Sequence, residues 1–170
     1  MSAQHGLRAW AYLSAVAEPP CRELAALVAA VGAEEAAQRV RCGAVSSTLA
    51  ERTAARRDID TAATDLEMLD RRGGRIVTPD DEEWPHLAFA SFGGAELRAK
   101  PSGIAPLALW VIGPQRLDDI YDRAAAIVGT RAATTYGEHV AGELAAGLAE
   151  HDVGIVSGGA FGIDGAAHRA

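Results

Sequence analysis

Residues 124–164 read AAAIVGTRAATTYGEHVAGELAAGLAEHDVGIVSGGAFGID, and this stretch decides the fold class. It begins with an apolar run at 124–128, which enters the turn Gly129-Thr130-Arg131. A second apolar run, at 153–156, leads into a glycine-rich turn at 157–162. Short apolar runs bounded by glycine are typical of buried strands. We therefore predict two strands, each followed by a tight turn.

A helix is predicted between the two strands, over about residues 136–150. Thr134 or Thr135 can cap its first turn. Its apolar residues share one face, which we expect to pack on the sheet: Val140, Ala141, Leu144, Ala145 and Leu148. Asp164 opens a further helix after the second strand. Strand, helix and strand with short loops predict a βαβ unit with parallel strands and a right-handed crossover.

The chain stops at Ala170, about one turn into a helix and after two strands of a parallel sheet. Parallel sheets are covered by helices on both faces and usually have about five or six strands. The predicted fold class is therefore α/β, a Rossmann-like parallel sheet that is incomplete. We expect the chain to be the truncated front part of a longer protein.

The first 75 residues are predicted to be helical throughout. Apolar residues recur at helical spacing, and helices are expected over about 6–16, 21–31, 34–41 and 47–72. Gly32 and Gly43 stop two of them, and Gly73-Gly74 closes the last. This region predicts a small all-helical module ahead of the sheet. For residues 51–57 a solvated, charge-rich linker helix is the alternative.

The region from about residue 75 to 121 changes character. A short strand is predicted at 75–78, a loop around Gly93-Gly94, and a buried strand at 107–113. The aromatic residues of this region are expected in the core: Trp84, Phe89, Phe92 and Trp110.

Composition restricts the function classes. The 170 residues are 49% apolar and 23% charged, which is enough for a folded core, and the net charge is −7. Residues 76–170 carry the whole net charge, with five arginines and one lysine against thirteen acids. A globally basic nucleic-acid binder is therefore not expected, and a phosphate ligand has to be held by local geometry.

The sequence carries no signal for targeting or for a metal. Only Cys21 and Cys42 occur, outside any CxxC or Cys/His cluster, so neither a disulfide framework nor a metal site is expected. No apolar run approaches the roughly 18 residues of a membrane span, and the N-terminus does not resemble a signal peptide. We expect a cytoplasmic protein without a cofactor and without a membrane partner.

Both predicted turns follow the carboxyl ends of parallel strands, the edge at which open sheets bind ligands. Glycine allows the backbone to approach an anion, and Arg131 offers a forked donor to phosphate oxygens. Thr130 and Ser157 add hydroxyl donors. Residues 129–131 and 157–162, called the two-turn site below, therefore predict a phosphate cradle. The alternative is that these glycines serve turn geometry alone, since neither turn has a GxGxxG or Walker A motif.

Four further residues near the turns have two interpretations each. Asp164 and His168 stand four apart and could form a catalytic pair, but Asp164 is more simply the N-cap or a first-turn acid, with His168 as its polar partner. No third group completes a nucleophilic constellation. Tyr136 and Phe161 either stack on unpaired bases or pack in the core.

Four sequence elements, by their order and spacing, resemble the DNA-processing protein A family, known as DprA or Smf. They are Trp84-Pro85-His86-Leu87, the strand at 109–113, the turn at 127–131 with Tyr136-Gly137, and the stretch 155–168. The resemblance implies that residues 76–170 are the first part of an extended Rossmann-like domain. Residues 1–75 fit the family loosely, as a SAM-like or helix-hairpin-helix-like module.

The resemblance also implies a function without catalysis. It implies binding of single-stranded DNA, loading of the RecA recombinase in natural transformation and competence, and a homodimer of the intact protein. Arg131 is implied as the backbone phosphate contact, and Phe161 as a stacking residue. The rim of the pocket is implied to be Gly129, Thr130, Ser157, Gly158, Gly159 and Gly162, with Tyr136, Asp164 and His168 in support.

Two other functions stay open at this point. A Rossmann-type nucleotide-processing enzyme, similar to the cytokinin-activating phosphoribohydrolases, would carry a PGGxGTxxE motif, which does not occur in these residues. Alternatively, the helical front is the functional unit, a protein- or duplex-docking module supported only by Gly32 and Gly43 at helix ends.

Overall fold

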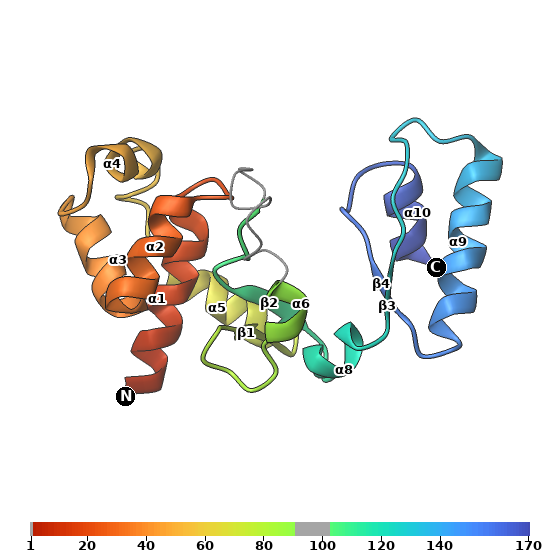
Figure 1. The fold of residues 1–170 in the computed structure, drawn as a ribbon, viewed down its shortest axis with the longest axis horizontal. Helices are drawn as coiled ribbons and strands as arrows, with labels where there is room; N and C mark the ends of the chain where they lie inside the picture. The colour runs from red at the N-terminus through yellow and green to blue at the C-terminus, as the bar shows by residue number, and fades with distance from the viewer. Residues whose placement is uncertain (1, 91–102) are drawn as a thin grey trace. The chain divides into compact units, whose positions relative to one another are not determined.

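The structure is a computed structural model that describes residues 2–90 and 103–170. The loop predicted around Gly93-Gly94 and the predicted core residue Phe92 lie outside the described residues. Contacts divide the chain into a first unit, Met1–Pro114, and a second unit, Gln115–Ala170. Figure 1 shows helices at the start of the first unit, and strands alternating with helices in the second. The domain boundary after residue 75 stays a prediction.

Helices begin the first unit, as expected for an all-helical module. Their bounds are α1 Ser2–Val16, α2 Arg22–Val31, α3 Ala33–Cys42, α4 Ser47–Thr53 and α5 Ala62–Arg71. Gly32 and Gly43 end α2 and α3 with positive φ angles of 80° and 70°, which residues other than glycine rarely adopt. Ser46 caps α4, because its Oγ accepts a hydrogen bond from the Leu49 N–H. The buried faces of these helices form one core, which includes Tyr12, Leu13, Leu24 and Val40.

The prediction of one helical stretch from 47 to 72 is wrong, because residues 54–61 interrupt it. Helical propensity is a weak preference, and here tertiary contacts override it. The Arg57 carbonyl in this interruption accepts a hydrogen bond from the Tyr12 hydroxyl at 2.9 Å. The Asp60 carboxylate accepts one from the first N–H group of α5 at 3.1 Å, so a new helix starts there.

Tyr12 makes the stability of the first unit depend on pH. Its side chain is 2% exposed, and burial raises the pKa of its hydroxyl above the ordinary 10.0. A pKa raised on folding stabilises the fold below the unfolded pKa, and this contribution is lost as the pH rises through the folded pKa. We expect the free energy of unfolding to fall more steeply above about pH 10 in the wild type than in Tyr12→Phe. Urea titrations over that pH range measure the difference, and parallel curves for the two proteins would contradict it.

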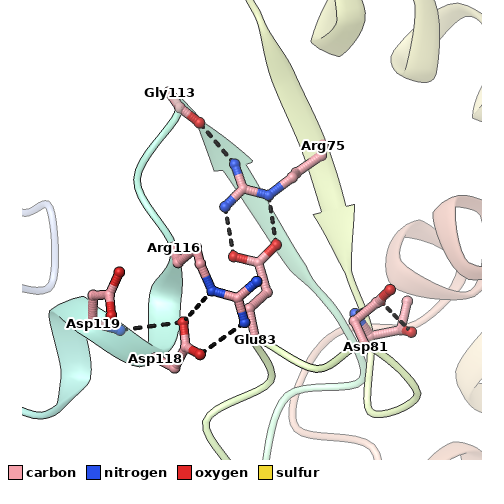
Figure 2. A network of polar contacts seen from close by, with 8 residues as sticks. Arg75, Asp81, Glu83, Gly113, Arg116, Asp118 and Asp119 are labelled. Carbon is pink, nitrogen blue, oxygen red and sulfur yellow. Dashed lines mark hydrogen bonds and ion pairs between the residues drawn. The ribbon is translucent and has the colours of Figure 1, made fainter.

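A two-stranded antiparallel sheet follows the helices, formed by β1 (Gly74–Val77) and β2 (Leu109–Ile112). β1 confirms the short strand predicted there. The Arg75 guanidinium donates to both carboxylate oxygens of Glu83 at 2.6 Å and to the Gly113 carbonyl at 2.7 Å, and Figure 2 draws these contacts. This forked contact ties the acidic turn after β1 to the end of β2.

The strand predicted at 107–113 is present, but the prediction that it is buried is wrong. Trp110 on β2 is 41% exposed, since alternate side chains of the strand face solvent. Trp110 is therefore not the core residue that we predicted. Trp84 is buried as predicted, and the Phe89 ring, on α6 (His86–Ala90), contacts it at a centroid distance of 5.1 Å.

The second unit contains the predicted βαβ unit. Its elements are α8 (Leu117–Tyr121), β3 (Ala124–Ala126), α9 (Thr135–Ala149), β4 (Gly154–Val156) and α10 (Ile163–Arg169). β3 and β4 pair in parallel, which confirms the α/β class. Thr134 caps α9 as predicted, since its Oγ1 accepts a hydrogen bond from the Gly137 N–H at 3.1 Å.

Within α8, hydrogen bonds from Arg116 hold the pKa of Asp118 below its usual value (Figure 2).

The face of α9 that packs on the sheet differs in part from the predicted one. Ala141 and Ala145 are buried, and Leu148 packs against the same core. Val140 is 44% and Leu144 53% exposed, so the expectation that these two residues face the sheet is wrong. Small side chains allow close packing of α9 on its neighbours, and the alanines therefore occupy the interface in place of the larger residues.

Candidate functional site

The structure brings the two predicted turns together at one edge of the parallel sheet. Gly129-Thr130-Arg131 follows β3 and residues 157–162 follow β4, and parallel strands end at the same edge. The Ile163 N–H donates to the Thr130 carbonyl at 3.2 Å, which joins the start of α10 to the first turn. In Figure 1 both turns lie above the labels of β3 and β4.

Three glycines of the two-turn site are required by the close packing of the turns. A Cβ on Gly129 would lie 2.6 Å from a side chain of α10, and a Cβ on Gly158 would lie 2.9 Å from the Asp164 carboxylate. A Cβ on Gly162 would clash with the backbone of the first turn. Turn geometry therefore explains these three residues. Gly159 differs, because its φ is 69° and a Cβ there would meet no atom within 4 Å.

Asp164 connects the two turns. Only 6% of the residue is exposed, and its two carboxylate oxygens accept hydrogen bonds from different turns. Oδ1 accepts from the Gly129 N–H at 3.2 Å, and Oδ2 accepts from the Gly158 N–H at 3.1 Å. The sequence left Asp164 as either the N-cap of α10 or an acid in its first turn. The first-turn position is confirmed. The N-cap is wrong, because Gly162 holds that position and no side chain of the described residues caps α10. The expected partnership with His168 is wrong as well, since the oxygens bond the turns and His168 is exposed.

Several donors of the two-turn site have no partner in the described part of the chain. The backbone N–H groups concerned belong to Thr130, Arg131, Gly159, Ala160 and Phe161. The Arg131 guanidinium is exposed, and it forms no ion pair or hydrogen bond with a described residue. By contrast, Arg116 and Arg169 of the same unit are ion-paired. The site therefore offers one positive charge and a set of backbone donors to an anion.

Ser157 contributes a second kind of unpaired donor. Its Oγ is buried, and it has no hydrogen-bond partner among the described residues. Buried hydroxyl groups in native proteins almost always have a partner, and the partner of the Ser157 hydroxyl is not among the described residues. The hydroxyl follows β4 directly and so belongs to the same edge of the sheet.

The two aromatic residues near the turns are exposed. Tyr136 is 77% and Phe161 87% exposed, so the alternative that they pack in the core is wrong. Phe161 lies in the second turn of the site, residues 157–162. Tyr136 lies in the first helical turn of α9, the helix that follows Gly129-Thr130-Arg131 in the chain. Both rings are free to stack on a flat ligand.

One donor of the site lies inside the predicted second turn but was not named as a site residue from the sequence. Ala160 has no side-chain chemistry, but its N–H lies between those of Gly159 and Phe161 in a run of unpaired amides. A glycine that requires a positive φ inside a turn is the signal that could have identified such a run, because successive amides then point to one side.

Two features are absent from the described residues. Across 2–90 and 103–170, no three His, Cys, Asp or Glu side chains gather in a way that could hold a metal ion. Over the same ranges, no helix combines the length and the apolar character that crossing a membrane requires.

Comparison with known proteins gives a matching family and two similar proteins. The sequence profile of a family described as DNA recombination-mediator protein A matches residues 75–170, which include the whole two-turn site. Proteins from two strains of Mycobacterium tuberculosis, provisionally named DNA processing protein DprA, are each 70% identical to this chain over 163 residues. The alignment covers 96% of this chain and 42% of the relative, so the chain spans less than half the length of these relatives.

Proposed function

The chain belongs to the DNA recombination-mediator protein A family, and on this premise we propose that it binds single-stranded DNA at the two-turn site. The observation that carries the proposal is the exposed Arg131 beside several backbone N–H groups, all without a partner among the described residues, together with two exposed aromatic rings. A phosphate is bound by positive charge and hydrogen-bond donors, whereas an unpaired base is bound by stacking on a flat apolar surface. A single strand offers both groups within one nucleotide.

Each part of the site has a role in this proposal. Arg131 and the N–H groups of residues 159–161 hold a backbone phosphate, and Thr130 adds a hydroxyl donor at the rim. Phe161 and Tyr136 stack on neighbouring bases. Stacking and phosphate contacts do not distinguish one base from another, so binding is expected to be independent of sequence.

The larger role that we propose belongs to the full-length protein. Family membership supports a mediator that holds a strand and loads a RecA-type recombinase on it, during natural transformation and recombination in the cytoplasm. We also propose a homodimer for the intact protein, as the family resemblance implies. None of these steps requires catalysis by the chain.

The two alternatives gain no support from the described residues. Both oxygens of Asp164 are engaged by backbone N–H groups, so this carboxylate is not a free acid or base for a nucleotide-processing reaction. In the helical front, Arg39, Arg41, Arg52 and Arg56 are ion-paired with carboxylates. Pairing reduces the charge that these four side chains offer to DNA, although exposed ion pairs are weak.

The test is a titration of a labelled oligo-dT strand, followed by fluorescence anisotropy over a series of salt concentrations. We would compare the full-length gene product with this 170-residue chain, and the single strand with a duplex of equal length. The expected result is salt-dependent binding that is weaker for the duplex, because paired bases cannot stack on Phe161. No binding, or equal binding of both DNA forms, would contradict the proposal. Release of free base from a nucleoside monophosphate would instead favour the enzyme alternative.

The orphan hydroxyl of Ser157 gives an independent prediction. Ser157→Ala is expected to raise the free energy of unfolding by about 1 kcal/mol, because it removes a buried polar group without a partner. The same variant is expected to bind the single strand several-fold more weakly, because the ligand loses a donor. Urea unfolding and anisotropy measure the two effects. A variant that is less stable and binds unchanged would show that the hydroxyl serves the fold and not the ligand.

A further inference from the structure

We propose that Asp164 is a positioning residue, which assembles the two-turn site before the strand arrives. The inference rests on the proposed function and adds a residue that need not touch the DNA. Asp164 is buried, and its oxygens hold the Gly129 and Gly158 amides at 3.2 and 3.1 Å. These amides belong to different turns, and Gly129 lies 35 residues from Asp164 along the chain.

A carboxylate suits this position for two reasons. It accepts hydrogen bonds at both oxygens, and bonds to an ionised acceptor are stronger than those to a neutral one. The space around it is also limited, because a Cβ on Gly158 would lie 2.9 Å from Oδ2. The Asp164 carboxylate therefore engages the Gly129 and Gly158 amides, which a DNA phosphate could otherwise use. The phosphate is left with the remaining donors, Arg131 and the N–H groups of residues 159–161.

The sign of the expected effect distinguishes positioning from simple electrostatics. A negative charge close to a phosphate site repels the DNA, so by Coulomb's law alone the removal of Asp164 would tighten binding. Positioning predicts the opposite. Without Asp164 the turns lose the bonds that hold them in register, and part of the binding free energy is spent on ordering them.

The test uses the full-length gene product with Asp164→Ala, measured by anisotropy with labelled oligo-dT. We expect binding to weaken by about tenfold relative to the wild type. Glu143→Ala is the matched control, because Glu143 is exposed on α9, is unpaired in the described residues and carries the same charge. The control is expected to bind as the wild type or slightly more tightly.

Rescue by formate provides a readout that a general loss of folding would not give. Asp164→Ala leaves a small cavity with two unpaired N–H donors, which fits one small carboxylate. Sodium formate, exchanged for chloride at constant ionic strength, is expected to raise the affinity of Asp164→Ala for oligo-dT by at least about threefold. It should have no such effect on the wild type or on Arg131→Ala.

The outcomes separate this inference from the proposed function. If the wild type does not bind oligo-dT, both fail together. If the wild type binds and Asp164→Ala binds equally or more tightly, the positioning role alone is overturned. Should Asp164→Ala not fold, Asp164→Asn replaces it, because its side chain keeps the shape and can accept from only one of the two amides. An Asn variant that binds as the wild type also overturns the inference.

Discussion

Arg131→Ala is expected to lower the affinity of the full-length protein for a single strand by about ten- to a hundredfold. Arg131 is an exposed cation at the two-turn site and has no partner among the described residues, so its whole charge is available to the DNA. A hydrogen bond to a charged group contributes about 1.5–3 kcal/mol, which corresponds to that loss. One phosphate contact fewer also makes the plot of log affinity against log salt shallower by about 0.7.

The matched control for this measurement is Arg123→Ala. The Arg123 guanidinium is also exposed and without a partner in the described residues, but the residue precedes β3, at the opposite end of the strand from the two turns. Its removal changes the net charge equally, so its effect on binding and on the salt slope should be small. Equal losses for both variants would mean that general charge drives binding, and the two-turn site would no longer explain it.

Gly162→Ala is expected to have the largest effect on stability, a loss of about 3 kcal/mol or more in the free energy of unfolding. Gly162 has φ 80° and ψ −127°, a conformation that only glycine adopts readily. An added Cβ would also meet the Thr130 carbonyl oxygen and lie 2.7 Å from the Arg131 carbonyl oxygen. Both contacts are with backbone, which cannot move aside cheaply. Urea unfolding of the chain measures the loss.

Gly147→Ala is the control, and its effect should have the opposite sign. Gly147 lies inside α9 without a positive φ, and a Cβ there would meet no atom within 4 Å. Alanine favours the helix over glycine by about 0.8–1.0 kcal/mol, so this variant should be more stable than the wild type. If both variants lost similar stability, the close approach of the two turns would not be the cause at Gly162.

Much of the second unit could be predicted from sequence because its signals are local. The apolar runs, the glycine turns and the capping threonine at 134 all act within a few residues, and each predicted element is present. Local patterns were insufficient where a choice between two faces had to be made. The spacing of Val140 and Leu144 fits a buried helix face, yet the neighbouring alanines are buried, because close packing of α9 selects the smaller side chains.

Contacts distant in sequence account for the other differences. Residues 54–61 have helical propensity, and only the bond from the distant Tyr12 hydroxyl to Arg57 shows why the helix is interrupted there. The sequence pattern predicts Trp110 to be a core residue. Its observed exposure depends on the number of strands beside β2 and of layers packed on it.

The sequence alone determined the α/β class, the two turns and the residue types that can bind a phosphate, because these follow from short-range periodicity and from the chemistry of glycine and arginine. Only the tertiary structure decided which of these groups are free. It engages two amides of the turns with Asp164 and, within 2–90 and 103–170, gives the Ser157 hydroxyl no partner. It also leaves the guanidinium of Arg131 exposed at the edge of the sheet. Hydrogen bonds between residues as far apart as Gly129 and Asp164 form only when the backbone is folded, so no local sequence pattern predicts them.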